Sequence, residues 1–284
     1  MSVELEQIGD CTLYRGDALE ILPTLAAYSV HVVITSPPYD DLRTYAGATW
    51  TFEPLADSLT QTLTPGGVLV WVVGDATING SETGTSMHQA LYFMEQCGLN
   101  LHDTMIYHKA NPGGARGSIY GYWQVFEFMF VLTKGRPQTF HPLRDRANAK
   151  AGATGRAGGR RNRDGTIEPP TVLTTVPYGR RGNIWSYPRG DGGLHPAVFP
   201  EALARDHIQS WSNVGDTVLD PFAGSFTTGV ACIQLGRRFL GIEIEPRYFD
   251  LGCRRIEEAY RQLALFPQPA PPAVPRQLAL EVTP

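Results

Sequence analysis

The sequence lacks the cysteine patterns that build metal sites or disulfide frameworks. Its 284 residues include four cysteines, Cys11, Cys97, Cys232 and Cys253, and none of them form a C-x-x-C pair or a zinc spacing. Each lies in an apolar or helical stretch, where free cysteine usually behaves as a small buried hydrophobe. We therefore expect four buried free thiols and no metal site.

Long apolar runs are also missing. No apolar segment approaches the roughly 18 residues that a membrane-spanning helix needs. Residues 1–6 are acidic and lack the basic start and apolar core of a signal peptide. We expect a cytoplasmic protein, encoded by a bacterium or phage, that has no contact with membranes. With 42% hydrophobic residues, the chain can bury the core of one large domain.

The chain has no excess of positive charge and no common nucleotide fingerprint. The net charge is −4, so any anionic partner must be held by a local basic patch rather than by the whole surface. Neither G-x-G-x-x-G nor a G-K-[ST] phosphate loop occurs, and the missing G-x-G-x-x-G disfavours a nicotinamide-dependent oxidoreductase.

The hydrophobic pattern alternates between strands and helices. Apolar runs predict strands at 13–15, 30–34, 68–73, 103–108, 125–133, 218–220 and 238–244. Helices are predicted at 18–27 with an interruption at Pro23, and at 52–63, 87–96, 201–211, 227–235 and 246–265, with a turn at 65–67. This alternation indicates an α/β protein with a doubly wound, mostly parallel sheet. Ligands bind such sheets at the carboxyl ends of the strands, where Asp17, Ser36 and Asp75 are expected.

The segment Thr35–Tyr39 (T-S-P-P-Y) is a polar stop after a buried strand. Two prolines fix φ and remove two backbone donors, and Pro37 keeps Ser36 out of the helical region. The result is a rigid shelf of hydroxyl and carbonyl acceptors beside an aromatic ring. Such a shelf suits a flat base with an exocyclic NH2 group, and a proline turn closed by a half-buried Tyr39 is the structural alternative.

A second motif, D-P-F-A-G-S-F-T-T-G, occupies residues 220–229. A short strand ends at Asp220, a glycine-containing turn follows, and a helix begins near Thr227. Small residues allow a ligand to approach the backbone, and a helix N-terminus favours an anionic group such as a carboxylate. Glu243 ends the next strand and is placed to hold a ribose diol, although an acid at this position is a weak signal alone.

Arginine is concentrated between residues 144 and 164, where seven Arg or Lys stand against two Asp. Arginine can form bidentate hydrogen bonds with guanine and with phosphate groups, so this segment is a candidate nucleic-acid contact surface. A solvated surface loop is the alternative.

Together these features resemble the amino-methylating DNA methyltransferases that use S-adenosylmethionine. The resemblance rests on residues 35–39 and 220–229, on Gly16-Asp17 and Glu243, and on H-P-A-V-F-P at 195–200. The catalytic motif comes before the recognition region and the cofactor loop comes last, an order that resembles the β class. The resemblance implies a circularly permuted, seven-stranded methyltransferase sheet with a target-recognition insertion, duplex DNA as substrate and, by analogy, a homodimer.

The resemblance also implies a division of the chain and a set of site residues. Residues 1–135 would form the catalytic half, 136–194 the recognition region, 195–265 the cofactor-binding half of the same domain, and 266–284 a proline-rich tail. Ser36, Pro37, Pro38 and Tyr39 would hold the flipped base. The cofactor would be bound by Asp17, Ser36, His195, Pro196, Phe199, Asp220, Pro221, Phe222, Ala223, Gly224, Ser225, Thr227, Thr228 and Glu243. Within this set, Asp17 would lie by the adenine, Glu243 would take the ribose hydroxyls, and residues 195–200 would close over the amino-acid end. Many members carry a lysine where this chain has Val198-Phe199.

Our candidates for DNA contact come from loops after strands and from the arginine-rich segment. They are Arg43, Tyr45, Lys109, Asn111, Arg116, Arg144, Arg146, Arg156, Arg160, Arg161 and Arg163.

The target base stays open at this level. Serine at position 36 resembles enzymes that methylate cytosine N4, whereas aspartate is commoner in those that methylate adenine N6, and both side chains accept a hydrogen bond from NH2. A methyltransferase of RNA or of protein amides, and a non-catalytic DNA-binding regulator, are the alternative functions. The sequence also leaves open whether the protein is a restriction partner or a solitary regulatory enzyme.

Overall fold

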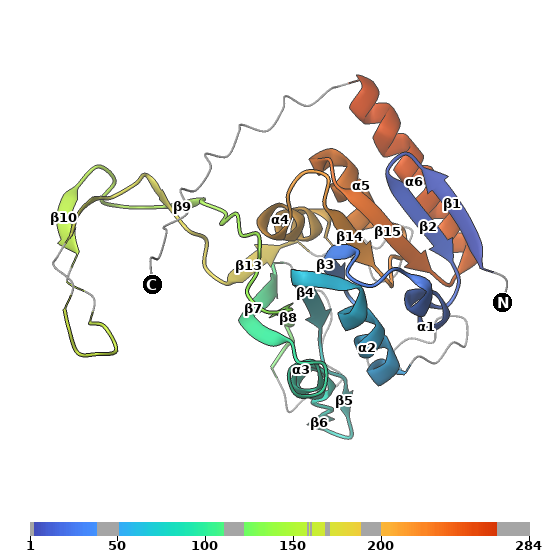
Figure 1. Cartoon of the computed structure of the whole chain (residues 1–284), viewed down its shortest axis with the longest axis horizontal. Helices are drawn as coiled ribbons and strands as arrows, with labels where there is room; N and C mark the ends of the chain where they lie inside the picture. Colours follow the sequence, from blue (N-terminus) through green and yellow to red (C-terminus); the bar gives the residue numbers. More distant parts are fainter. Residues whose placement is uncertain are drawn as a thin grey trace.

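The computed structural model describes residues 3–38, 51–110, 122–157, 159, 161–167, 171–188 and 200–265. In these residues a large sheet is covered by helices on both faces, and an arm projects from one side of the body (Figure 1). All further structural statements refer to these residues.

The central sheet has nine strands in the order β1-β2-β15-β14-β3-β4-β8-β7-β13. Their bounds in chain order are β1 Glu4–Ile8, β2 Cys11–Arg15, β3 Val30–Thr35, β4 Leu63–Val73, β7 Asn100–Lys109, β8 Phe126–Thr133, β13 Ile184–Tyr187, β14 Thr217–Asp220 and β15 Arg238–Glu243. Strands β2, β15, β14, β3 and β4 are parallel, and β8 runs antiparallel to both β4 and β7. The expected doubly wound, mostly parallel sheet is confirmed. It is larger than the expected seven strands because β1 and β13 extend its two edges.

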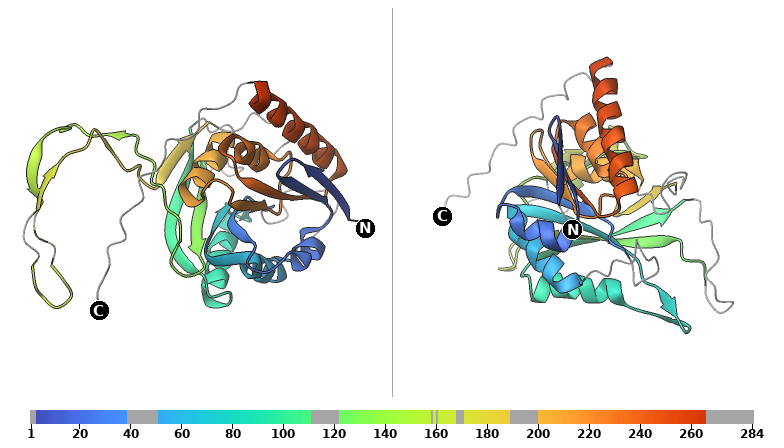
Figure 2. Two further views of the ribbon diagram at one scale, coloured as in Figure 1. Left: turned by 45° about the horizontal axis from the view of Figure 1, so that its top comes forward. Right: turned by 90° about the vertical axis from the view of Figure 1, so that its right-hand side faces the viewer.

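Helices pack on both faces of the sheet (Figure 2). On one face lie α1 Ala18–Ile21, the short 3-10 helix η1 Leu22–Thr24, α2 Phe52–Thr62 and α3 Thr85–Glu95. On the other lie α4 Glu201–Trp211, α5 Thr227–Leu235 and α6 Pro246–Leu265. Side chains along the strands alternate between two clusters: Leu69 and Trp71 pack with the first set of helices, and Val68 and Val70 with the second. Burial on both faces explains why these strands are continuous apolar runs in the sequence.

Most predicted elements agree with the structure, and three expectations need correction. Helices α4, α5 and α6 have the predicted bounds. The helix predicted at 18–27 ends early, because α1 stops at Ile21 and Pro23 lies in the short 3-10 helix. The turn predicted at 65–67 lies inside β4, where the register shifts as Val30 pairs with Leu63 and Val32 with Val68.

The third correction concerns the cysteines. All four are free, but only Cys11 and Cys232 are buried. Cys97 follows the end of α3 and Cys253 lies on α6, and both residues are half-buried.

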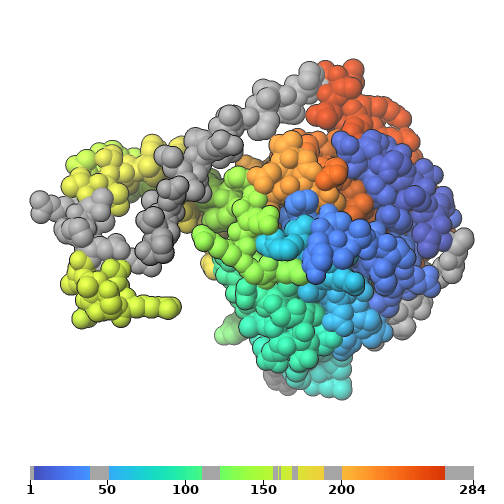
Figure 3. Space-filling model, viewed as in Figure 1, coloured from blue at the N-terminus to red at the C-terminus, as the bar shows by residue number. Residues whose placement is uncertain are grey.

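The arm contains most of the segment that we assigned to target recognition. It carries two small antiparallel sheets, one formed by β9 Arg146–Ala147 with β12 Tyr178–Gly179, the other by β10 Thr154–Ala157 with β11 Thr171–Thr174. In the space-filling view the arm stands apart from the body (Figure 3). Strand β13 also falls within residues 136–194, but it pairs with β7 in the central sheet.

A separate hairpin, β5 Thr77–Ile78 with β6 Ser81–Glu82, precedes α3. In the described part of the chain, no helix is long and apolar enough to cross a membrane.

Phe226 forms an aromatic wedge between α5, α6 and β15. Its backbone φ is 57°, and its ring is fully buried with Phe239 and Phe249 at centroid distances of 6.0 and 5.8 Å. The ring packs so closely on α6 that a Cβ atom at Gly252 would lie 2.5 Å from it.

Gly252→Ala should therefore lower the free energy of unfolding by about 1–3 kcal/mol, the usual cost of overpacking a core. Alanine is normally the better helix former by about 1 kcal/mol, so a loss of stability would identify the steric contact with Phe226. Urea denaturation gives the measurement. Gly182→Ala is the control, because a Cβ there meets no atom within 4 Å; equal stability of both variants and the parent would contradict the wedge.

Candidate active site

Five neighbouring parallel strands end at one edge of the sheet and carry polar residues there. In sheet order, β2, β15, β14, β3 and β4 are followed or closed by Asp17, Glu243, Asp220, Ser36 and Asp75. The expected positions of Asp17, Ser36 and Asp75 after strands are confirmed. The carboxyl ends of parallel strands in such sheets form ligand crevices, so this edge is the candidate site.

Asp220 holds two of these strand ends together. Its Oδ1 accepts hydrogen bonds from Thr35 Oγ1 at 2.8 Å and from the backbone N–H of Phe222 at 3.2 Å, and its Oδ2 accepts one from Thr228 Oγ1 at 2.7 Å. Burial raises the pKa of this carboxyl to about 6, although the three hydrogen bonds favour the ionised form. Thr35 ends the strand below the proline shelf, so Asp220 fixes the shelf beside the turn 220–228.

Glu243 supports the same turn from the next strand. Its Oε2 accepts from the backbone N–H of Gly224 at 2.8 Å, and its Oε1 accepts from that of Glu245 at 2.8 Å. Burial raises the pKa of Glu243 to about 7. Each carboxylate oxygen has two lone pairs, so both oxygens retain capacity for a further donor.

Asp17 lies on the neighbouring strand end and begins a helix. Its side chain accepts from the backbone N–H of Leu19 at 2.9 Å, which caps α1. The backbone N–H of Gly16 donates to the Glu243 carbonyl at 3.0 Å, and this bond holds the ends of β2 and β15 together. Asp17 and Glu243 therefore flank the same part of the edge.

Arg255 on α6 is a site residue that our sequence reasoning missed. Its Nη1 donates to the Ser225 carbonyl at 2.6 Å, to Ser225 Oγ at 2.8 Å and to Thr227 Oγ1 at 2.9 Å. One guanidinium thus fixes the start of α5 from outside the sheet. The helix carries several charged residues, and helical spacing alone does not distinguish the one that faces the turn.

The remaining residues of the turn are small or packed. Pro221, Ala223, Gly224, Thr227 and Thr228 are buried, and Phe222 and Ser225 are half-buried. The Ala223 N–H donates to the Ile242 carbonyl at 2.9 Å, which holds the turn against β15. A tight, glycine-containing turn, a helix N-terminus and a buried carboxylate with spare lone pairs form a donor and acceptor set that fits a nucleoside carrying an amino acid.

The shelf is described up to Pro38. Ser36 and Pro38 are half-buried and Pro37 is buried. Across the sheet from Thr35, Trp71 is fully buried and its indole N–H donates to Gln89 at 2.8 Å, so the strand beside the shelf is rigidly packed.

Asp75, on the other side of the shelf, uses its carboxylate to hold a neighbouring helix. It accepts from the backbone N–H and the hydroxyl of Ser86 at 2.8 and 2.6 Å, and these bonds hold the start of α3.

The candidate DNA contacts that the structure describes lie in two places. Lys109 ends β7 and its ammonium pairs with Glu127 at 2.7 Å. Arg144, Arg146, Arg161 and Arg163 are exposed on the arm, and the backbone of Arg156 lies in β10. Because β7 runs parallel to β4, Lys109 ends its strand on the same side of the sheet as the candidate site. The arm that carries the arginines projects away from the body (Figure 1).

Several expected site residues lie outside the described residues. They are Tyr39, Arg43, Tyr45, Asn111, Arg116, Arg160, His195, Pro196 and Phe199. Among the described residues, no group of three or more His, Cys, Asp or Glu side chains is arranged to hold a metal ion.

Comparison with known proteins identifies the family. The family model for N6/N4 methyltransferases, described as DNA methylase, matches residues 30–254, which is most of the chain. This chain belongs to the N6/N4 DNA methylase family. It is therefore an S-adenosylmethionine-dependent DNA methyltransferase that acts on an exocyclic amino nitrogen, adenine N6 or cytosine N4.

Named relatives cover nearly the whole methyltransferase. It is 43% identical over 265 residues to the orphan methyltransferase M.BamHII of Bacillus amyloliquefaciens, spanning 89% of this chain and 91% of that protein. It is 30% identical to the DNA adenine methyltransferase YhdJ of Escherichia coli, spanning 87% and 83% of the two chains.

Solved structures agree with the fold. The M1.HpyAVI–SAM complex matches with a TM-score of 0.58 at 25% identity, covering 87% of this chain and 98% of that one. The PvuII cytosine-N4-specific DNA methyltransferase matches with a TM-score of 0.65, covering 89% and 92%, and at 18% identity this likeness concerns the fold alone.

Arg255→Ala should weaken S-adenosylmethionine binding by roughly tenfold, because the turn loses three charge-assisted hydrogen bonds and becomes less ordered before binding. Isothermal calorimetry measures this directly. Arg254→Ala removes the same charge from an exposed neighbouring position and is the matched control. Equal affinities of the two variants would show that Arg255 has no role in cofactor binding.

Proposed function

We propose that this methyltransferase modifies the N4 nitrogen of cytosine in duplex DNA. The serine at the first position of the shelf supports this choice, because Ser36 resembles cytosine-N4 enzymes whereas aspartate is commoner in adenine-N6 enzymes. The 30% identity to a protein named as an adenine methyltransferase is the competing indication, and the base is therefore the first quantity to test.

The observation that carries the proposed active site is the Asp220 carboxylate between Thr35 and Thr228. Direct methyl transfer between two bound molecules requires that their two binding surfaces keep a fixed relative position. Good orientation of the reacting groups can lower the barrier by several kcal/mol. Asp220 provides this fixed position, because the shelf and the turn are hydrogen-bonded to the same buried side chain.

On the shelf, we assign the flipped base to residues 36–39. An aromatic amine is a weak nucleophile because its lone pair is delocalised into the ring. Ser36 Oγ and the Pro37 carbonyl would accept hydrogen bonds from the two N–H groups of the amine and favour a more tetrahedral nitrogen. Tyr39 would stack on the base and offset part of the few kcal/mol needed to take it out of the duplex.

The turn and its neighbours would bind the cofactor. Bound S-adenosylmethionine supplies a methyl group on a positively charged sulfur, so neither a metal nor a covalent enzyme intermediate is needed. Glu243 would use its spare lone pairs to accept hydrogen bonds from the ribose hydroxyls, and Asp17 would lie by the adenine. The start of α5 would face the amino-acid end, together with His195, Pro196 and Phe199, whose roles rest on the sequence alone.

We assign DNA binding to the arm and to loops at the sheet edge. The exposed arginines Arg144, Arg146, Arg161 and Arg163 offer forked donors to phosphates and base edges. Lys109 is a weaker candidate, because its charge is already paired with Glu127.

By analogy with the β class we further propose a homodimer that acts on duplex DNA in the cytoplasm and is encoded by a bacterium or a phage. Size-exclusion chromatography with light scattering would report the oligomeric state.

Nucleoside mass spectrometry on DNA incubated with methyl-labelled S-adenosylmethionine tests the function. We expect labelled N4-methylcytosine. Labelled N6-methyladenine would retain the enzyme class and reverse our choice of base. Label in RNA or protein but not in DNA would overturn the proposal, as would tight DNA binding without any transfer. Tyr39→Ala should reduce the transfer rate and leave cofactor affinity unchanged, since it removes the stacking face for the base and none of the residues that we assign to the cofactor.

The role of Glu243 predicts a pH dependence of cofactor binding. Hydroxyl donors bind the ionised carboxylate, and burial places its pKa at about 7 in the cofactor-free protein. Affinity for S-adenosylmethionine should therefore fall about tenfold as the pH is lowered from about 8 to about 6, in step with the ionised fraction. Glu243→Gln should bind more weakly and show a flatter profile, and parallel profiles of the two proteins would exclude the ribose contact.

A further inference from the structure

The arm joins the body at a polar cluster centred on Arg181. The outgoing chain at residues 143–148 and the returning chain at residues 176–181 run side by side and form a stalk. Backbone hydrogen bonds link Asn148 to Pro177 at 2.9 Å and Arg181 to Leu143 at 2.9 Å. Arg146 Nε also donates to the Arg180 carbonyl at 3.2 Å. The stalk is thus a narrow two-chain connection.

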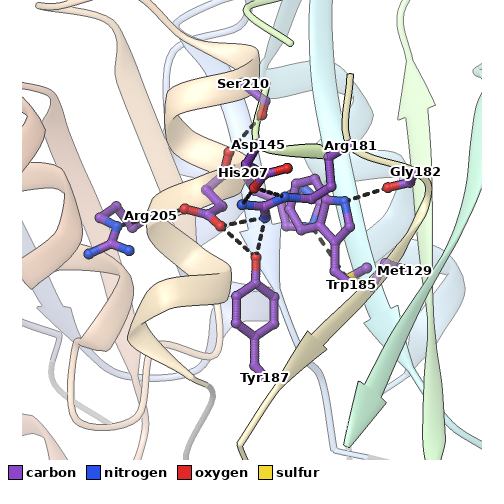
Figure 4. Close-up of polar contacts among 10 residues, drawn as sticks. Met129, Asp145, Arg181, Gly182, Trp185, Tyr187, Arg205, His207 and Ser210 are labelled. Carbon is purple, nitrogen blue, oxygen red and sulfur yellow. Dashed lines mark hydrogen bonds and ion pairs between the residues drawn. The ribbon is translucent and has the colours of Figure 1, made fainter. Parts of the chain in front are cut away.

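Arg181 bridges this stalk to the body. Its Nε donates to Asp145 Oδ2 at 2.7 Å across the stalk, and its Nη1 donates to Asp206 Oδ2 on α4 at 2.7 Å. The same Nη1 lies 2.9 Å from the Tyr187 hydroxyl on β13. Tyr187 in turn donates to Asp206 at 2.6 Å. One guanidinium therefore connects both chains of the stalk with a helix and a strand of the catalytic sheet (Figure 4).

The surfaces that receive Arg181 are themselves fixed. Its guanidinium lies 5.1 Å from the centre of the Trp185 ring, within range of a cation–π contact. The indole N–H of Trp185 donates to the Gly182 carbonyl at 2.9 Å, and its ring lies 4.5 Å from that of buried His207. Tyr187 and Asp206 are both buried as well. The guanidinium is planar and always charged, and these rigid surfaces hold it in one orientation. It can therefore fix the angle between the stalk and the body, which the flexible ammonium of a lysine would not do.

The charge balance of the cluster argues against direct contact between Arg181 and DNA. Two carboxylates, Asp145 and Asp206, bind the one guanidinium, and Arg205 approaches Asp206 from the exposed side at 3.7 Å. The hydrogen bond from Arg181 also lowers the pKa of the half-exposed Asp145 carboxyl, as expected for a committed ion pair. A phosphate would have to compete with both acids for the same donors.

We propose that Arg181 is a positioning residue that holds the recognition arm at a fixed angle to the catalytic sheet, so that sequence reading and base methylation occur in register. This inference rests on the proposed function, in which the arm contacts DNA. The arm has only small two-stranded sheets of its own, and its described part stands apart from the body, so its direction depends on the stalk and its anchor (Figures 1 and 3). A binding site whose supporting contacts are weakened can remain present and yet lose the geometry that its function needs.

The test compares Arg181→Met with Arg180→Met, which removes the same charge from an exposed position of the same stalk. The sites that the wild-type enzyme methylates in genomic DNA define the cognate sequence. Duplexes with that sequence, and with one base pair changed, then give kcat and KM for each variant. Arg181→Met should raise KM for DNA and lower the ratio of cognate to altered-site kcat/KM about tenfold, the scale of one base-pair contact. The kcat at saturating DNA and the affinity for S-adenosylmethionine should stay within about twofold of wild type, because the contacts of Arg181 involve none of the residues that we assign to the base or the cofactor.

Two further variants keep the test decisive if Arg181→Met fails to fold. Asp145→Asn removes only the partly exposed partner and leaves Asp206 paired. Arg181→Lys keeps the charge without the fork and should restore DNA affinity better than discrimination. The dependence of DNA binding on salt should keep its wild-type slope in Arg181→Lys and Arg181→Met alike, whereas a phosphate contact by Arg181 would reduce the slope in the Met variant by about one.

Hydrogen exchange separates this inference from the proposed function. The amides of residues 143–148 and 176–181 should exchange faster in Arg181→Met than in wild type or Arg180→Met, whether or not DNA is the substrate. Wild-type protein that methylates no DNA would refute the proposed function while this measurement still tests the anchor. Unchanged exchange together with unchanged discrimination in Arg181→Met would overturn the anchor.

Discussion

The buried carboxylate of Asp220 accepts hydrogen bonds from Thr35 at the end of β3 and from Thr228 at the start of α5. These two residues stand 193 positions apart in sequence by their numbers, and the arm and five strands of the central sheet lie between them in the chain. A carboxylate in this place costs free energy unless its lone pairs are used, and here both oxygens are. The pKa of about 6 reflects the remaining cost of burial. The shelf that we assign to the target base and the turn that we assign to the cofactor are consequently parts of one rigid unit.

Two arginines also connect separate segments through several hydrogen bonds each. Arg255 ties the turn to α6, and Arg181 ties the stalk of the arm to α4 and β13. In both cases a guanidinium replaces several separate contacts, because its planar donors can reach more than one acceptor at once. The body of the methyltransferase is held by apolar packing on both faces of the sheet, whereas its edge and its arm are held by a few charged side chains with precise geometry. We therefore expect substitutions in the core to affect stability, and substitutions of these arginines to affect binding and selectivity.

The sequence allowed much of the fold to be predicted, because its strands are buried on both faces and its last three helices have clear periodicity. The positions of Ser36, Asp220 and Glu243 at strand ends also followed from local pattern. What local pattern could not provide was the partner of each side chain. The hydrogen bonds of Asp220 to Thr35, Phe222 and Thr228 were therefore not predicted, because Thr35 comes from a distant part of the chain.

Other features escaped prediction for similar physical reasons. Arg255 was one charged residue among several on an amphipathic helix, and only the packing of α6 against α5 distinguishes it. Arg181 stood in a segment without periodicity, where contacts to Asp206 arise from the tertiary fold alone. The extra edge strands β1 and β13 are short and half-exposed, so their pattern is weak. The turn at 65–67 was recognised from its residues, but its inclusion in β4 depends on pairing with β3 and β8.

We infer that Asp220 holds the base shelf and the cofactor turn in register. The most direct measurement is made on Thr35→Val, which removes one donor to Asp220 from the shelf side without touching the turn. Cofactor affinity and the single-turnover rate of methyl transfer at saturating cofactor would be compared with those of Thr133→Val. Thr133 is also a buried strand threonine, but it lies at the opposite edge of the sheet and donates to Gly135. We expect Thr35→Val to weaken cofactor binding and slow methyl transfer, and Thr133→Val to change neither. Wild-type cofactor affinity in Thr35→Val would contradict this inference.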